Sequence, residues 1–145
     1  MSFRTWHNYG FGLCVDKISD VSLERVRALL QLAPGLEKEI EETAWELGYA
    51  DLDTYLRCSL RDEPTDTISS MLRETILAAE GLELCTCRNY EDECFLIYQP
   101  SYPWQMNAQD LELTEESLTK IFGEYVRVLT DDEIPLEYQE VENGG

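Results

Sequence analysis

Three cysteine residues are the strongest candidates for chemistry in this sequence. Cys85 and Cys87 stand two residues apart in an alternating run, and Cys94 follows after a turn. Alternate residues of a strand share a face, so three thiolates could in principle gather around a zinc ion. The local sequence supplies no fourth ligand for a tetrahedral site. We therefore interpret them as ordinary half-buried thiols and predict no metal site.

A cysteine nucleophile and a nucleotide-binding loop are the next possibilities. His7 is the single histidine, and no recognised nucleophile turn surrounds any of the five cysteines. Gly10-Phe11-Gly12 opens like a dinucleotide fingerprint, but Val15 occupies the third glycine position and the run does not follow a strand. We predict a conformational role for both glycines, no cofactor and no enzymatic activity.

Carboxylates are too numerous to single out an acid–base pair. The chain has 30 acidic residues, so many pairs arise by coincidence. Asp51-Leu52-Asp53 has the first spacing of a calcium loop, but Tyr55 and Leu56 occupy the next ligand and turn positions without a glycine. Calcium binding by this segment is therefore not predicted.

An aromatic loop around Pro103 is a candidate contact site. Tyr102 and Trp104 flank this proline, and aromatic neighbours raise the cis fraction of an X-Pro bond above its base rate. A rigid loop of this kind can present an aromatic side chain to a partner, or it can plug the core. Both interpretations stay open at this point.

Net charge limits the partners. The 145 residues carry 30 acidic and 11 basic side chains, a formal charge of −19. Residues 37–66 contain ten acids and three bases, and residues 110–142 contain eleven acids and two bases. Such a field repels phosphate backbones and anionic membranes and speeds encounter with basic proteins. We expect neither direct nucleic-acid binding nor membrane binding, although the charge could serve solubility alone.

The length and composition favour one domain over residues 1–145. No apolar run reaches the length of a membrane span, and no signal peptide opens the chain. An odd number of cysteines suits reduced thiols. We expect a cytoplasmic protein.

Hydrophobic spacing and turn residues predict the order of the elements. Strands are expected over residues 5–15, 82–88, 94–99 and 134–141, and helices over 23–33, 36–47, 66–80 and 115–129. A further short helix is expected to end at residue 60, with Asp51 or Asp53 as its N-cap. This order predicts an α+β fold, with a small sheet of about four strands and four or five helices packed mainly on one face. The last strand is expected at an edge, because Pro135 cannot donate to a ladder.

The second helix carries the clearest acidic face. Its inward stripe is predicted to contain Leu36, Ile40, Ala44 and Leu47, with Gly48 as a C-terminal stop. Glu39, Glu42 and Glu46 then occupy outward positions. The helix layer is therefore expected to present carboxylates to solvent.

Three segments support a family resemblance. They are Trp6-His7-Asn8-Tyr9-Gly10-Phe11-Gly12, Pro100-Ser101-Tyr102-Pro103-Trp104-Gln105-Met106 and Val141-Glu142-Asn143-Gly144-Gly145. The chain resembles a family of small proteins encoded on phages and conjugative elements of Gram-positive gut bacteria. Such elements encode anti-CRISPR and anti-restriction inhibitors, several of them compact and acidic. The resemblance implies a role in a bacterial host cell and transfers no catalytic residue.

The working hypothesis is a non-enzymatic inhibitor that mimics phosphates on a basic protein surface, such as that of a CRISPR effector or a restriction enzyme. The alternative is a structural or adaptor protein, either as a monomer or as a homodimer. The predicted partner-binding residues are Glu37, Glu39, Glu42, Glu46, Asp51, Asp53, Tyr102, Trp104, Asp131, Asp132 and Glu133.

Overall fold

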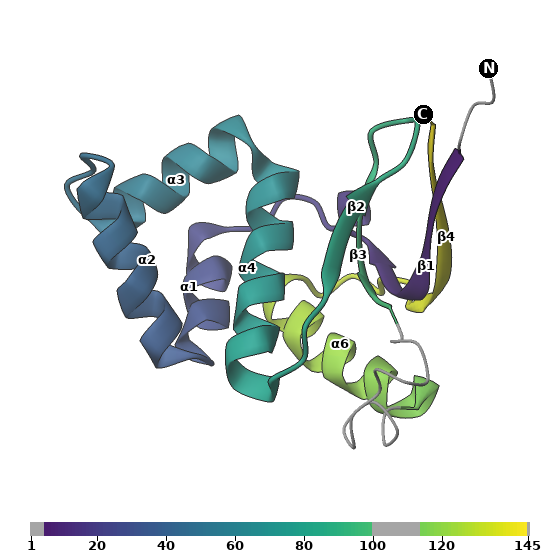
Figure 1. Ribbon diagram of the computed structural model, residues 1–145. Helices are drawn as coiled ribbons and strands as arrows, with labels where there is room; N and C mark the ends of the chain where they lie inside the picture. Colours follow the sequence, from purple (N-terminus) through teal and green to yellow (C-terminus); the bar gives the residue numbers. More distant parts are fainter. Residues whose placement is uncertain (1–4, 100–113, 145) are drawn as a thin grey trace.

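The computed structural model describes the backbone of residues 5–99 and 114–144, and the side chains of residues 10–99 and 114–141. Four helices separate the first strand from a hairpin, and a further helix precedes the last strand (Figure 1). The elements are β1 (Thr5–Cys14), η1 (Val15–Lys17), α1 (Leu23–Gln31), α2 (Pro34–Glu46), α3 (Leu52–Asp62), α4 (Pro64–Glu80), β2 (Cys85–Arg88), β3 (Cys94–Tyr98), α6 (Glu115–Leu129) and β4 (Glu137–Gly144). The predicted α+β fold is confirmed.

The sheet has the strand order β2-β3-β1-β4, and every neighbouring pair is antiparallel. Leu13 of β1 and Leu96 of β3 are register partners, and both face the helices within the main core. Cys14 and Phe95 are the next partners and belong to a small cluster on the opposite face. Figure 1 shows the helices on one side of the sheet, as predicted.

Two glycines let β1 and β3 approach closely. A Cβ atom added to Gly10 would collide with the carbonyl oxygen of Tyr98, and one added to Gly12 would collide with that of Leu96. Only glycine fits where another backbone comes this near. The predicted conformational role of Gly10 and Gly12 is therefore confirmed.

Helix starts follow local capping chemistry. The hydroxyls of Ser22 and Thr114 accept hydrogen bonds from the amides of Arg25 and Ser117, at 3.2 and 3.1 Å. These bonds satisfy amides that have no partner within the helix. The sequence predicts Asp20 or Ser22 as the cap of the first helix and Thr114 as the cap of the last, and the structure has Ser22 and Thr114.

Two helix starts were predicted two residues too late. The second helix begins at Pro34 rather than Leu36, and α4 begins at Pro64 rather than Asp66. Proline breaks the preceding helix, but it also suits the first position of the next one, because its missing N–H would have no partner there. Each proline therefore separates two helices with almost no loop between them.

Helical spacing predicts inward positions for Leu47 of α2 and Ala79 of α4, and both assignments were wrong. Leu47 is 62 % exposed, and Ala79 is exposed near the end of α4. Both residues lie in the last turn of a helix or just beyond it, where the neighbouring elements no longer cover the stripe. Leu36 and Ala44 are buried as predicted.

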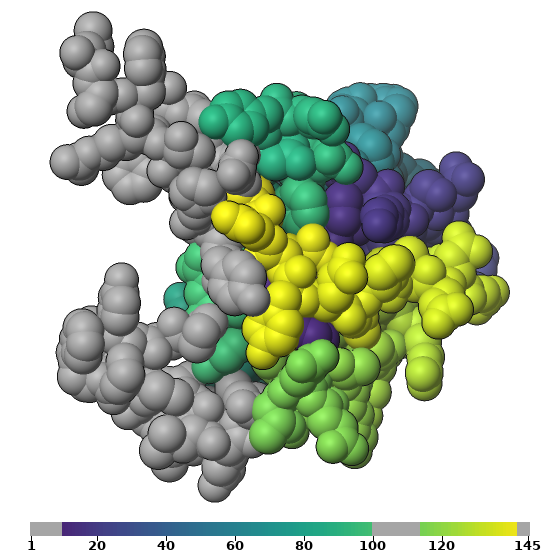
Figure 2. All heavy atoms as spheres, turned by 90° about the vertical axis from the view of Figure 1, so that its right-hand side faces the viewer, coloured from purple at the N-terminus to yellow at the C-terminus, as the bar shows by residue number. Residues whose placement is uncertain are grey.

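The strand β4 lies at an edge of the sheet, as predicted, but it begins at Glu137 rather than Ile134. Pro135 therefore precedes the ladder. Figure 2 shows β4 in yellow across one face, with α6 on one side of it and the β2–β3 hairpin on the other. None of the helices in the described ranges combines the length and apolar content needed to cross a bilayer.

Candidate functional site

The outward face of α2 carries three exposed carboxylates. Glu39, Glu42 and Glu46 are all exposed, and their spacing of three and then four residues places them on one side of the helix. In the part of the chain that the structure describes, none of the three forms an ion pair. Figure 1 places α2 at the end of the helical layer farthest from the sheet. This face is open to a partner.

Local sequence fixes the orientation of that face. Leu36 and Ala44 are buried on the opposite side of α2, so rotation of the helix would expose them. Pro34 begins the helix, and Gly48 follows it with a φ of +90°, a conformation that favours glycine. The carboxylates therefore sit on a short helix with defined ends.

Two of the predicted contact residues form ion pairs within the fold. The guanidinium of Arg27 in α1 donates to Glu37 in α2 at 2.7 Å and to Asp53 in α3 at 2.5 Å. Burial alone would lower the pKa of Arg27, but the hydrogen bonds to Asp53 and Glu37 raise it overall. These carboxylates are already neutralised and join three helices. They are poor candidates for binding a second cation.

Asp51 also has a structural task. Its carboxylate accepts a hydrogen bond of 2.7 Å from the amide of Thr54 and caps α3. That hydrogen bond holds the pKa of Asp51 below its ordinary value. Asp51 stays exposed, so it retains one side open to a partner.

The second predicted acidic set lies apart from α2. Asp131 forms an ion pair of 2.8 Å with Arg25, and its side chain is 89 % exposed. Asp132 and Glu133 follow in the exposed loop between α6 and β4. Helix α1 packs against both α2 and α6 and separates the two sets (Figure 1). The predicted acids therefore form two groups rather than one ridge.

The aromatic loop cannot be placed, because Tyr102, Pro103 and Trp104 lie outside the described residues. A different tryptophan is available on α2. Trp45 is 61 % exposed and stands three residues after Glu42. Helical spacing could have predicted this exposure. Trp45 is the residue after Ala44, so it projects about 100° around the helix from the last member of the inward stripe of Leu36, Ile40 and Ala44.

The cysteines do not converge. Cys85 and Cys87 pack on the sheet face away from the helices, whereas Cys94 belongs to the main core. Burial, followed by the neighbouring Cys85, raises the pKa of the Cys87 thiol to about 12. The side chain of His7 lies outside the described ones. Within the described residues, no group of three or more potential ligands is arranged to hold a metal ion.

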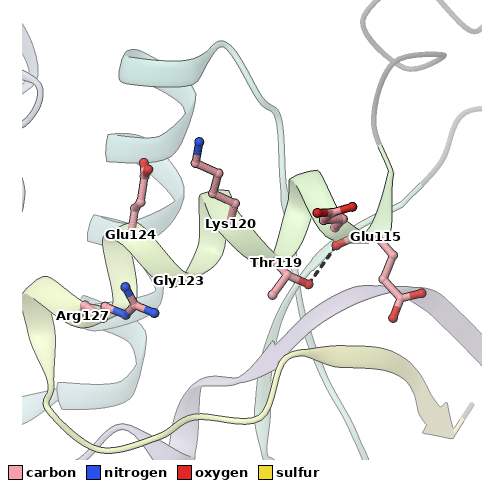
Figure 3. A pocket seen from close by; sticks show the side chains of 7 residues that line it. Glu115, Thr119, Lys120, Gly123, Glu124 and Arg127 are labelled. Atoms are coloured by element: carbon pink, nitrogen blue, oxygen red, sulfur yellow. Dashed lines mark hydrogen bonds between the residues drawn. The ribbon is translucent and has the colours of Figure 1, made fainter.

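A surface depression with a volume of about 720 Å³ follows one face of α6. Figure 3 shows Lys120 and Glu124 extending to the same side of the helix, while the Thr119 hydroxyl donates to the Glu115 carbonyl at 2.8 Å. The described residues that line this depression are Glu115, Glu116, Thr119, Lys120, Gly123, Glu124 and Arg127. They combine both charge signs and bring no nucleophile against a base.

No family model, curated protein or solved structure matches this chain. Inference about function therefore comes from the residues and their geometry.

Proposed function

We propose that this protein is a non-enzymatic inhibitor that docks the acidic face of α2 onto the cationic groove of a nucleic-acid-binding defence protein. The observation that carries the proposal is the exposed row of Glu39, Glu42 and Glu46, which has no ion pair among the described residues. Asp51 follows this row in sequence and caps the start of α3. The defence protein would be a CRISPR effector or a restriction enzyme, which places the inhibitor in the cytoplasm of a bacterial host.

The spacing of these charges supports phosphate mimicry. An α-helix rises about 1.5 Å per residue, so the three carboxylates stand roughly 4.5 and 6 Å apart along the axis. One strand of DNA carries a phosphate about every 3.4 Å along its axis. The helix is less dense than DNA, but it offers charges at intervals that a row of arginines can bridge.

The unpaired face also raises the energy of the isolated protein. Like charges three or four residues apart on a helix destabilise it by roughly 0.2–0.5 kcal/mol per pair. Glu39 with Glu42 and Glu42 with Glu46 are two such pairs. A cationic partner would remove this repulsion, and the net charge of −19 would accelerate the encounter. The resemblance to proteins of mobile elements supports the same class of partner.

A displacement assay tests the proposal. Purified RNA-guided CRISPR nucleases and restriction endonucleases would be loaded with fluorescent DNA, and the protein would be titrated into each complex. We expect displacement from at least one nuclease, at least tenfold weaker for the E39Q/E42Q/E46Q variant. The E83Q/E91Q/E124Q variant is the control, because it changes the net charge equally at exposed sites outside α2. The proposal would be overturned if the protein displaced DNA from none of the nucleases. It would also be overturned if both variants lost displacement activity to the same extent.

The adaptor alternative rests on a different surface. Leu32 and Leu77 are 48 % and 39 % exposed, and they line an open groove of about 490 Å³ between the start of α2 and the end of α4. Exposed apolar surface of this kind can form a homodimer contact. Analytical ultracentrifugation separates the two functions, since the inhibitor is expected to sediment as a monomer and the adaptor as a dimer that L32K/L77K dissociates.

A further inference from the structure

The exposed tryptophan of α2 adds information about the partner. Trp45 is 61 % exposed, and among the described residues its indole has neither a ring contact nor a hydrogen bond. A large aromatic surface left in water is costly to the isolated molecule, at roughly 25 cal/mol per Å² of apolar area. Tyr49 and Tyr55, close by in sequence, are only part-exposed and pack against each other. The exposure of Trp45 is therefore not shared by its aromatic neighbours.

The position of Trp45 relative to the carboxylates is specific. At 100° per residue, Trp45 projects about 60° from Glu42 around the helix axis and stands roughly 4.5 Å farther along it. Glu46 is the next residue. A flat aromatic ring thus stands beside two anionic groups on the solvent side of one helix. An unpaired nucleotide has the same combination, a base with an exposed face next to phosphates.

Duplex and single-stranded nucleic acids differ in the surface that Trp45 would imitate. In a duplex the base faces are stacked and hidden, so a groove for duplex DNA needs only phosphate contacts and base edges. Grooves for unpaired strands combine basic side chains with arginine or aromatic planes on which bases stack. A row of carboxylates would suffice for the first kind of groove. The indole of Trp45 beside these carboxylates fits the second kind, a groove for unpaired strands.

We propose that the partner is a protein groove that binds unpaired nucleic acid, in which Trp45 occupies the stacking position of a base. The carboxylates of Glu42 and Glu46 then take the positions of phosphates, and an arginine or aromatic side chain of the groove packs on the indole. This inference rests on the proposed function and narrows its partner class. It assigns Trp45 the anchoring role that sequence reasoning gave to Trp104.

A competition experiment with two nucleic-acid probes tests the inference. Each nuclease of the panel would be loaded with a fluorescent 20-nucleotide poly(dT) strand or, separately, with a blunt 20-base-pair duplex. The protein is expected to displace the single strand at a concentration at least tenfold lower than it needs for the duplex. W45A should weaken displacement of the strand by about tenfold, equivalent to about 1.4 kcal/mol, and W45F should recover part of that loss.

Tyr90 provides the matched control. It is 63 % exposed, at the turn between β2 and β3, so Y90A removes an equally exposed aromatic ring far along the molecule from α2 (Figure 1). We expect Y90A to change displacement less than twofold. Circular dichroism of W45A should match that of the unmodified protein, because an exposed side chain contributes little to the core.

The outcomes separate this inference from the proposed function. If E39Q/E42Q/E46Q weakens displacement while W45A does not, the acidic face is supported and the stacking role is overturned. Equal displacement of duplex and single strand would also overturn the inference. A dimer that W45A dissociates would assign Trp45 to a contact between two copies of this chain and contradict it. If the protein displaced nucleic acid from none of the nucleases, both proposals would be overturned.

Discussion

Arg27 holds the acidic helices in place. It is the one described residue that bridges carboxylates on two other helices, Glu37 of α2 and Asp53 of α3. Its side chain is 31 % exposed, and Glu37 is 22 % exposed, so solvent screens these pairs less than pairs on the open surface. The orientation of α2 relative to α1 depends on this contact.

Replacing Arg27 with methionine should destabilise the protein. The R27M variant keeps much of the apolar stem but leaves two partly buried carboxylates without a cation, so the free energy of unfolding should fall by about 1–2 kcal/mol. Urea denaturation followed by circular dichroism measures the change. R61M is the control, because among the described residues Arg61 forms its ion pair with the adjacent Asp62 alone and is 73 % exposed. Equal losses in the two variants would contradict the bridging role.

Asp51 predicts a pH effect with a defined sign. Its folded pKa lies below the ordinary value of 3.8, because the Thr54 amide donates to the carboxylate. The stabilisation is therefore present above pH 3.8 and is lost as the pH falls through the folded pKa. D51N should match the unmodified protein at pH 7, since asparagine also caps helices, and should lose less stability near pH 3. Urea titrations at pH 7 and near pH 3 measure the free energy of unfolding of both proteins. If D51N and the unmodified protein lost the same amount between the two pH values, this effect would be excluded.

At the scale of elements, the two strand glycines contrast with a helical one. A side chain at Gly12 meets the backbone of β3, whereas a Cβ atom on Gly35 of α2 has no atom within 4 Å. G12A should lower the free energy of unfolding by about 3 kcal/mol or prevent folding, and G35A should raise it by up to about 1 kcal/mol. Thermal melts of both variants test the difference. A well-folded, stable G12A protein would show that β1 and β3 can separate without cost.

The acidic face of α2 should lower the stability of the free protein. Converting Glu39, Glu42 and Glu46 to glutamine removes two repulsive pairs and the single attractive spacing of Lys38 with Glu42, and it hardly changes helix propensity. The free energy of unfolding should therefore rise by up to about 0.5 kcal/mol. The gain should exceed that of E83Q/E91Q/E124Q, because Glu83 and Glu91 lie in connecting segments and Glu124 lies in α6. A loss of stability in urea would instead indicate that the carboxylates make contacts needed by the fold.

Sequence patterns predicted these elements well where the signal is local. Ser22 and Thr114 act within one helical turn, and the Gly81 stop lies next to the helix that it ends. Contacts between distant segments were not predictable in the same way. Arg27 pairs with residues 10 and 26 positions away, so its selection of Glu37 and Asp53 depends on how three helices pack. The free acidic set is therefore smaller than charge counting predicted.

At the scale of the whole molecule, charge is distributed unevenly. The main core lies between the sheet and the helices, and α2 lies at the far end of the helical layer (Figure 1). The loop after α6 presents Asp131, Asp132 and Glu133 elsewhere on the surface. Two separate acidic groups can engage only a long groove together, so under the proposed function α2 alone would dock onto a compact groove.

The dependence of nuclease binding on salt tests the central claim most directly. Isothermal titration of the protein into a nuclease identified by the displacement assay would be repeated from about 50 to 500 mM NaCl, with E39Q/E42Q/E46Q measured in parallel. If α2 docks through its carboxylates, affinity should fall steeply with salt, and the variant should bind more weakly with a shallower salt dependence. Affinity that is independent of salt, or a variant that binds as tightly as the unmodified protein, would contradict the account.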